Sequence, residues 1–383
     1  MFCNFTSNHL SITQNDGRIR PCCEYIGDDS WLDCKAENVS TLESVLKSYR
    51  WFNLREEHVE GGYKHSGCIN CEKQEKINIL SHRQWGNHFQ ESNNLLEDLE
   101  ISLGNNCNMM CRICRPGQSS MWDSAIEKIP LLNKIDRYSM TKNGQEYVLP
   151  LLKKSNLSNL KRVTILGGET LINPNFNLFI DLLESKCNLK NLELRIVTNG
   201  SIFPSSKIKT FNKMKNVYID LSIDAIGKHA ETIRYGQPWK LIYKNIKKWL
   251  NNSFNVKIAN VISLLNVNKI DEVVNFARDL NLPVCSVELE WPKYLRSSMI
   301  PKNMRKKWVL DIEEKEYQIN FFHAMYNHKE ISRINSIINV DEIDPENYFI
   351  DFINATKMID DYQNIKFKDS NSEIWEIVND YRH

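Results

Sequence analysis

Cysteine placement constrains this chain more than any other sequence feature. Nine of the eleven cysteines lie within the first 114 of 383 residues. Crowded cysteines form disulfides in secreted proteins, whereas in the cytosol they more often bind metal or carry out redox chemistry. The first residues, MFCNFTSNHL, lack the basic and then apolar pattern of a secretory signal. The sequence therefore predicts a cytoplasmic metalloprotein.

Composition argues against several other classes of protein. The chain is 42% hydrophobic and has a net charge of only +1, which does not fit a disordered protein. Because 49 Lys and Arg residues nearly balance 48 Asp and Glu residues, the charge argues against a nucleic-acid partner. No run of 18 apolar residues is present, so we expect no membrane partner.

Residues 1–94 are polar, carry six cysteines and have too little apolar material for a large core of their own. We therefore predict a small cysteine-rich domain that is stabilised by metal. Ser40, Thr41 and Glu43 form a capping-box pattern, which predicts a helix that continues through LESVLKSYRWF.

Residues 95–300 alternate between strand and helix patterns, with helices predicted at 175–186, 239–250 and 269–280. Strands rich in Val and Ile, separated by helices, indicate an α/β fold with a parallel sheet. Six strands are fewer than the eight of a closed TIM barrel, so a partial barrel or an open sheet is expected. The strands are predicted at 99–104, 162–167, 192–198, 217–223, 256–262 and 285–290.

Residues 301–383 have a helical texture and are predicted to form a C-terminal extension. Helices are expected at 306–326 and 346–362. The extension could cover the barrel or bind a protein partner.

A cysteine triplet follows the first predicted strand. Cys107, Cys111 and Cys114 have the spacing C-x3-C-x2-C. Three thiolates this close on a loop can bind one face of an iron–sulfur cluster and leave one iron open to a further ligand. A zinc knuckle or a chance spacing would be the simpler explanations of the triplet alone.

Further motifs stand where successive predicted strands end. Gly167, Gly168 and Glu169 follow the second strand, and Thr198, Asn199 and Gly200 follow the third. The fourth strand ends near Ser222 and Asp224, and Arg234 lies twelve residues after the serine. Because α/β folds bind ligands at the carboxyl ends of their strands, these residues are predicted to share one site.

This set of motifs resembles the radical S-adenosylmethionine (radical SAM) superfamily over about residues 99–290. The resemblance implies a partial (β/α)6 barrel in which Cys107, Cys111 and Cys114 hold a 4Fe-4S cluster whose open iron binds S-adenosylmethionine. Residues implied to bind the cofactor are Gly167, Gly168, Glu169, Thr198, Asn199, Ser222, Asp224 and Arg234. Thr170 replaces a common proline of the family, and Ile113 replaces a common aromatic residue.

The N-terminal cysteines resemble the opening of SPASM and twitch domains, which bind an auxiliary 4Fe-4S cluster. Cys3, Gly17 and Cys22 match the C-x9–15-G-x4-C hairpin, and Cys68 and Cys71 would complete four ligands. In most relatives the auxiliary domain follows the barrel, whereas here it would precede it. Cys23 or Cys34 could replace one ligand, and a structural zinc remains an alternative. Cys187 and Cys285 are predicted to be ordinary core cysteines.

The resemblance implies a radical SAM enzyme that reductively cleaves S-adenosylmethionine and abstracts a hydrogen atom from a substrate. An electron donor such as flavodoxin or ferredoxin is implied as a partner. The substrate is expected to be a peptide or protein, or else a small metabolite or carbohydrate, and Glu288, Glu290 and Trp291 are candidate contacts. A non-catalytic iron–sulfur electron carrier or sensor is an alternative of another class. A zinc-dependent RNA-binding module is a third, which the charge balance disfavours.

Overall fold

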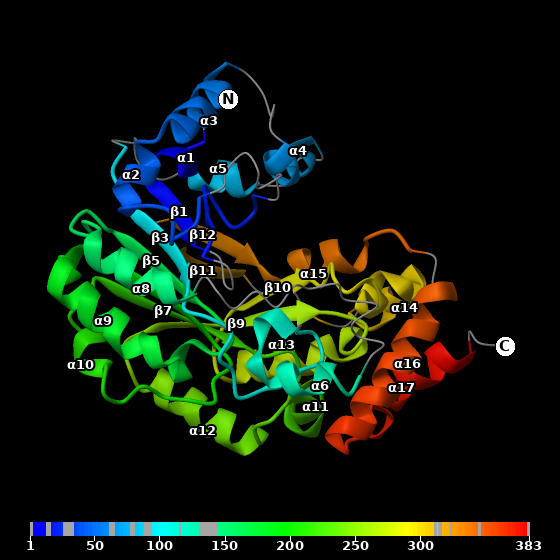
Figure 1. The fold of residues 1–383 in the computed structure, drawn as a ribbon. Helices are drawn as coiled ribbons and strands as arrows, with labels where there is room; N and C mark the ends of the chain where they lie inside the picture. Colours follow the sequence, from blue (N-terminus) through cyan, green and yellow to red (C-terminus); the bar gives the residue numbers. More distant parts are fainter. Residues whose placement is uncertain are drawn as a thin grey trace.

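The fold is organised around one eight-stranded sheet, whose strand order is β10-β9-β7-β6-β5-β3-β1-β2 (Figure 1). All neighbouring strands are parallel except β2, which runs antiparallel to β1. The computed structural model describes residues 3–12, 17–25, 34–60, 66–76, 81–87, 94–114, 116–129, 145–309, 312, 316–321, 324–343 and 346–380.

All six strands predicted from the sequence are present in this sheet. Their inward and outward residues alternate, as in β9, where buried and partly exposed side chains follow each other. The apolar partners Leu99, Val163 and Leu194 lie at one level of three adjacent strands and are fully buried. The strands are β3 (Asp98–Ser102), β5 (Arg162–Leu166), β6 (Glu193–Thr198), β7 (Asn216–Ser222), β9 (Asn255–Ile262) and β10 (Val284–Glu288).

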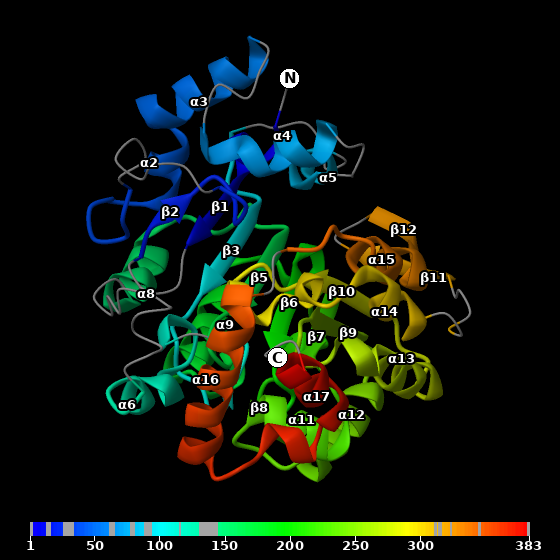
Figure 2. The same cartoon turned by 90° about the vertical axis from the view of Figure 1, so that its right-hand side faces the viewer.

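Helices lie around the outer side of the curved sheet (Figures 1 and 2). Helix α12 (Trp239–Leu250) shows why they pack there, because Ile242, Ile246 and Trp249 recur at helical spacing and are buried. The three predicted helices are confirmed within one residue at each end by α9, α12 and α13. The other helices of this part are α6 (Asp123–Ile126), α8 (Gln145–Lys154), α9 (Pro174–Lys186), α10 (Ile208–Phe211), α11 (Gly227–Ile233) and α13 (Ile270–Asp279).

The N-terminal cysteine-rich segment is continuous with the sheet. Strand β1 (His9–Ile12) pairs in parallel with β3, and β2 (Ile19–Arg20) pairs with β1. Gly17 has φ +66°, a left-handed conformation that suits glycine in the connection between them. The remaining helices of this segment are α1 (Phe5–Asn8), α2 (Leu42–Leu46), α3 (Tyr49–Val59), α4 (Ile69–Lys76) and α5 (His82–Gly86).

The predicted capping box is shifted and its helix is divided. Thr41 caps α2, and its partner is Ser44 rather than Glu43. Helix α2 ends at Leu46, and α3 begins after Ser48, whose hydroxyl oxygen accepts a hydrogen bond from the Trp51 amide. Serine competes for backbone hydrogen bonds in this way, which favours a new helix start over a continuous helix.

The C-terminal extension is not wholly helical, so the helix predicted at 306–326 is wrong. Helix α14 (Lys302–Lys307) is short, and β11 (Glu316–Phe321) pairs antiparallel with β12 (Ala324–Lys329). In the sequence Tyr317, Ile319 and Phe321 alternate with polar residues, which is the two-residue period of a strand. Helices α15 (Glu330–Ile338), α16 (Glu346–Gln363) and α17 (Ser372–Asp380) follow. No helix in the described part of the chain is long and apolar enough to cross a membrane.

A buried charge network ties β1 to the rest of the sheet. Asp98 of β3 lies 3.1 Å from the His9 side chain of β1 and 3.3 Å from the Arg162 guanidinium of β5. Burial alone would raise the pKa of Asp98, but the charges and hydrogen bonds of Arg162 and His9 outweigh it and lower the pKa to about 2.

We expect Asp98→Asn to lower the free energy of unfolding by about 3 kcal/mol at pH 7, because it leaves buried charges uncompensated. Since the folded pKa lies below the ordinary value of 3.8, the stabilisation exists above that pH and is lost as pH falls toward 2. Urea unfolding of the metal-free protein at pH 7 and pH 3 tests this, with Asp181→Asn as the exposed control. If Asp98→Asn lowered the free energy of unfolding equally at both pH values, the low pKa of Asp98 would be contradicted.

Candidate active site and cysteine-rich pocket

The cysteine triplet lies on the loop that follows β3. Cys111 is on the short strand β4 (Met110–Cys111), which pairs antiparallel with β8 (Arg234–Tyr235) and sets Cys111 opposite Arg234. The Cys107 amide donates to the Ser120 hydroxyl oxygen at 3.1 Å. The Trp122 indole N–H donates to the Cys111 carbonyl at 3.2 Å. These hydrogen bonds attach the cysteine loop to the segment that follows it.

The three thiols are close enough to shift one another's pKa. The side chains of Cys111 and Cys114 are hydrogen-bonded to each other, and this bond lowers the pKa of Cys114. Burial raises the pKa of Cys107 to about 11, and repulsion from Cys111 adds to the rise. The Arg234 guanidinium lies 4.0 Å from the Cys111 sulfur. This positive charge beside Cys111 favours the thiolate, which is the form of cysteine that binds iron.

The loop of Gly167, Gly168 and Glu169 packs directly against the cysteine loop. The Gly168 amide donates to the Gly104 carbonyl at 2.8 Å, and the Glu169 amide donates to the Asn106 carbonyl at 2.7 Å. A Cβ atom on Gly168 would lie within 3.0 Å of the carbonyl oxygens of Asn105 and Asn106. Glycine is therefore required here for close backbone approach.

Glu169 connects the second and third strand ends. Its buried carboxylate accepts hydrogen bonds from the Thr198 hydroxyl at 2.7 Å and from the Asn199 amide at 2.6 Å. Burial raises the pKa of Glu169, and these hydrogen bonds oppose the rise. The Asn199 side-chain amide then donates to the Asn108 side chain at 3.0 Å, inside the cysteine triplet. The two strand ends and the cysteine loop thus form one network.

Asp224 and Arg234 form a buried ion pair beside this network. The distance between Arg234 Nη2 and Asp224 Oδ2 is 2.7 Å. Although burial disfavours a charged guanidinium, Asp224 holds the pKa of Arg234 above its usual value. Ser222 lies at the end of β7, two residues before Asp224. The predicted cofactor residues on β5, β6 and β7 thus end or follow their strands, whereas Arg234 is the first residue of β8 and lies opposite Cys111.

These residues fit a cluster that is held by three thiolates. The loop offers only soft sulfur ligands, and a buried cation lies next to them. The surrounding donors and acceptors are Thr198 and Asn199, which bond to Glu169, and Asp224, which pairs with Arg234 beside that network.

Several residues of the site were not singled out from the sequence. Asn108, Ser120 and Trp122 hold the loop by hydrogen bonds that no motif spacing reveals. Gly236 has φ +129°, and its Cβ would lie 2.6 Å from the Asn108 carbonyl oxygen. Only the turn composition around Gly236 could have indicated it.

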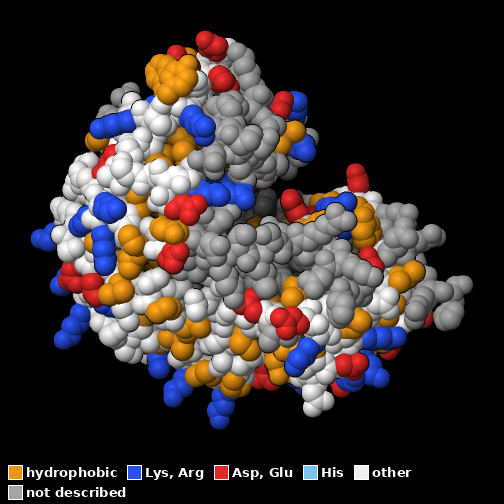
Figure 3. Space-filling view, viewed as in Figure 1, with side chains coloured by type: hydrophobic (Ala, Val, Ile, Leu, Met, Phe, Trp, Pro, Cys, Tyr) orange, Lys and Arg blue, Asp and Glu red, His pale blue; other side chains and the backbone are white. Residues whose placement is uncertain are grey.

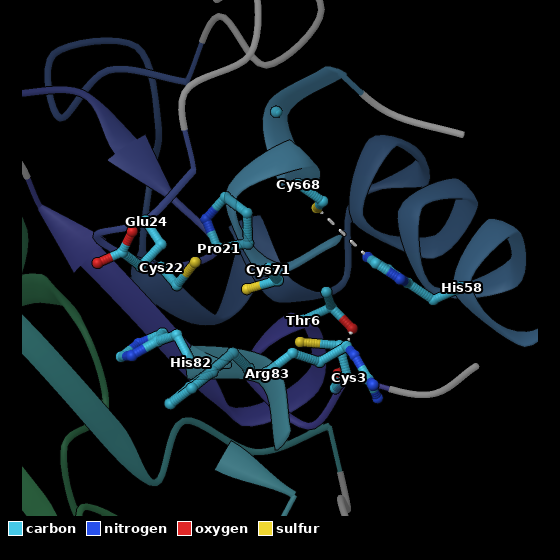
Figure 4. Close-up of a pocket in the computed structure, with 12 residues that line it drawn as sticks. Cys3, Thr6, Pro21, Cys22, Glu24, His58, Cys68, Cys71, His82 and Arg83 are labelled. Atoms are coloured by element: carbon cyan, nitrogen blue, oxygen red, sulfur yellow. Dashed lines mark hydrogen bonds between the residues drawn. The ribbon is translucent and has the colours of Figure 1, made fainter. Parts of the chain in front are cut away.

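The second predicted cysteine set converges on a separate pocket. Cys3, Cys22, Cys68 and Cys71 line one pocket, together with residues that include His58, His82 and Arg83. Figure 4 shows the four sulfur atoms arranged around this pocket. Burial, together with repulsion from Cys71, raises the pKa of Cys3 and Cys68 to about 12. Binding of metal here must therefore displace protons.

The alternative ligands, Cys23 and Cys34, are not themselves part of the pocket lining. Cys23 is exposed and contacts His82 at 3.8 Å, and Cys34 contacts the hairpin through its carbonyl, which accepts from the Ile19 amide. Neither is among the residues that line the pocket. The Cys187 thiol donates to the Leu157 carbonyl, and Cys285 is on β10. Among the described residues, no three Cys, His, Asp or Glu side chains are close enough to share one metal ion.

The concave face of the sheet carries charged side chains. Asp220 of β7 is buried, and its Oδ2 accepts from Arg195 Nε at 2.8 Å and lies 3.4 Å from Lys257 Nζ. Glu100 accepts from the Ser11 hydroxyl at 2.8 Å. The adjacent residues along these strands, such as Leu99 and Ile196, are core residues and point to the other face.

The predicted substrate contacts after β10 have separate environments. Glu288 accepts from the Ser297 hydroxyl at 3.3 Å and lies 3.8 Å from Arg296, and burial raises its pKa. Trp291 is 39% exposed. Burial raises the pKa of Glu24, and repulsion from Glu290 adds to the rise. Acidic and basic side chains intermingle on the face shown in Figure 3, without a large patch of one sign.

Comparison with curated proteins finds distant relatives. GTP 3',8-cyclase from Helicobacter pylori is 24% identical over 235 residues, which are 59% of this chain and 65% of that protein. The S-adenosylmethionine-dependent nucleotide dehydratase from Flammeovirga pacifica is 25% identical over 209 residues, 50% of this chain and 63% of that protein. The chain thus spans somewhat under two thirds of the length of these relatives.

Solved structures give weaker likenesses. The structure of anSMEcpe with bound AdoMet has a TM-score of 0.35 at 15% identity and covers 50% of this chain and 51% of that chain. Streptococcus suis SuiB bound to S-adenosylmethionine has a TM-score of 0.37 at 17% identity and covers 69% of this chain and 49% of that chain.

One family model matches the region that contains the site. The model of the radical SAM superfamily matches residues 101–280, which run from β3 to the end of α13 and include the cysteine triplet and the motifs at the strand ends. Residues 101–280 of this chain therefore match the radical SAM superfamily.

Proposed function

We propose that this protein is a radical SAM enzyme that cleaves S-adenosylmethionine at the cysteine triplet and abstracts a hydrogen atom from a polar substrate. The observation that carries the proposal is the continuous network from Asn108 of the cysteine loop through Asn199 to Glu169. An electron carrier would need the cysteines but no such shell of donors and acceptors at three strand ends.

Each group of residues in the site would have a separate role in the reaction. When bound, a reduced 4Fe-4S cluster supplies the electron that cleaves S-adenosylmethionine to methionine and a 5′-deoxyadenosyl radical. Cys107, Cys111 and Cys114 would hold that cluster. The backbone of Gly167, Gly168 and Glu169, the strand ends at Thr198 and Asn199, and the Ser222, Asp224 and Arg234 set would orient the cofactor. The buried members of this set, which are Glu169, Thr198, Asn199, Asp224 and Arg234, would also keep water away from the reactive carbon.

Binding of S-adenosylmethionine to an open iron gives a direct test. We expect the anaerobically reconstituted and reduced protein to show a 4Fe-4S electron paramagnetic resonance signal that changes when S-adenosylmethionine is added. S-adenosylhomocysteine, which lacks the sulfonium charge, is the matched ligand control. A protein that takes up zinc, or a signal that S-adenosylmethionine leaves unchanged, would contradict the proposal.

The pocket of Cys3, Cys22, Cys68 and Cys71 is proposed to hold an auxiliary 4Fe-4S cluster. Four thiols from the hairpin and from the start of α4 line one pocket, which supports a closed site with four ligands. Such a site favours electron transfer over direct binding of substrate. The His58 imidazole lies 3.6 Å from the Cys68 sulfur and could hydrogen-bond it. A single zinc ion is the competing occupant.

The substrate is proposed to be polar, because Glu100, Arg195, Asp220 and Lys257 face the concave side of the sheet. A peptide or protein is one candidate class, and the features of the chain do not select it over a small molecule. A nucleotide is favoured by one observation, since two relatives are named GTP 3',8-cyclase and nucleotide dehydratase. Equilibrium binding of GTP to the reconstituted protein tests the nucleotide class, and ATP is the control for recognition of the base.

A further inference from the structure

The cysteine loop has an attachment that the proposed chemistry does not explain. Arg112 stands between Cys111 and Cys114, yet its side chain is buried away from them. Its backbone amide donates to the Ile233 carbonyl at 2.8 Å, and its Nε donates to the Thr232 carbonyl at 3.0 Å. Arg112 thereby joins the cysteine loop to the residues directly before Arg234.

The remaining bonds of Arg112 come from the C-terminal helix α16. Its Nη2 donates to Asp360 Oδ1 at 2.7 Å and to Gln363 Oε1 at 3.0 Å. The Gln363 side-chain amide in turn donates to the Met110 carbonyl at 3.2 Å. Helix α16 thus binds the loop on both sides of Cys111, although the partners are about 250 residues apart in sequence.

The contact is deeply buried and is itself supported. The side chains of Arg112 and Asp360 are 2% and 6% exposed. The Phe367 amide donates to the Asp360 carboxylate at 3.0 Å, and the Phe367 ring lies 5.9 Å from the Arg112 guanidinium. A buried ion pair holds its geometry firmly, because loss of either partner leaves an uncompensated charge.

The segment after α16 also binds α11 and the connection after β9. The Asn371 side chain donates to the Leu265 carbonyl at 3.0 Å, in the connection that follows β9. The Ser370 hydroxyl contacts His229 of α11 at 3.1 Å. Residues 360–371 therefore bridge the cysteine loop, α11 and the connection after β9.

We propose that Asp360, Gln363 and Phe367 form a C-terminal clamp, which positions the cysteine triplet for cluster and cofactor binding. The clamp acts through Arg112 and Met110 and touches no reacting atom, so its members are positioning residues. This inference rests on the proposed function of the triplet. It gives the C-terminal extension a role in the chemistry of a site that is distant in the sequence.

Two variants of neighbouring aspartates test the clamp. Asp360→Asn removes the charge that faces Arg112, and Asp361→Asn makes the same change at a side chain that is 74% exposed and pairs with Lys366. In the reconstituted full chain we expect Asp360→Asn to lose iron to a chelator about tenfold faster from the triplet cluster, the effect of one charge-assisted hydrogen bond. The spectral change on addition of S-adenosylmethionine should also weaken, while Asp361→Asn should match the wild type.

A second variant keeps the test decisive if Asp360→Asn does not fold. Gln363→Leu leaves the ion pair intact and removes only the bonds to Met110 and Arg112. We expect it to speed iron loss in the same direction. The clamp would be overturned if Asp360→Asn and Gln363→Leu both behaved like Asp361→Asn. That result would be an equal rate of iron loss and an equal spectral response to S-adenosylmethionine. A wild-type protein that binds no cluster would instead overturn the proposed function, and the clamp with it.

Discussion

Replacing Gly168 with alanine should lower the free energy of unfolding by about 3 kcal/mol, because the added methyl group meets two backbone oxygens that cannot rotate away. The cysteine loop would have to move away from the loop of Gly167 to Glu169, and both belong to the candidate site. We therefore also expect less iron to be retained at the triplet. Urea unfolding of the metal-free protein and iron analysis after reconstitution measure the two effects.

Gly227→Ala is the matched control for this steric argument. Gly227 has φ +58°, yet nothing lies within 4 Å of the added Cβ atom. Its cost should be only the left-handed strain of about 1 kcal/mol, without an effect on iron. Equal stability and equal iron content of Gly168→Ala and Gly227→Ala would contradict the requirement for close packing at Gly168.

Removing two ligands of the N-terminal pocket should halve the iron content. We expect the wild type to hold about eight iron atoms per chain, as two 4Fe-4S clusters, and Cys3→Ala/Cys71→Ala to hold about four. The remaining iron should keep the spectral response to S-adenosylmethionine, because the triplet lies at the other end of β3 from this pocket.

Cys23→Ser is the control for the ligand assignment, because Cys23 is next to Cys22 but lies outside the pocket lining. It should retain the full iron content. Loss of four iron atoms in this variant would show that Cys23 is a ligand. Zinc at about one atom per chain in the wild type, absent from the double variant, would make the pocket a zinc site.

Much of the sheet could be predicted from the sequence, because its strands are runs of Val and Ile separated by amphipathic helices. Strands β1 and β2 could not, since four and two residues are too short to show a period. In addition β3, which pairs with β1, is about 90 residues away in the sequence. The error at 306–326 has a related cause, because a short strand pattern inside apolar sequence is easily taken for a helix.

The candidate site also has features that could be predicted from the sequence and others that could not. The spacing of Cys107, Cys111 and Cys114 and the glycines at Gly167 and Gly168 are local signals, so a motif reveals them. The contact of Arg112 with Asp360 spans 248 residues, and a lone arginine between two cysteines gives no indication of its partner. Local chemistry is thus readable from the sequence, whereas the support that positions it depends on the tertiary fold.

The central claim is that the cysteine triplet cleaves S-adenosylmethionine, and formation of 5′-deoxyadenosine measures it most directly. The anaerobically reconstituted protein, given dithionite and S-adenosylmethionine, should form the nucleoside, and Cys111→Ala should form none. Cys187→Ala, whose thiol is outside both sites, should behave as the wild type. A wild-type protein that is loaded with iron and sulfide but forms no 5′-deoxyadenosine would contradict the claim.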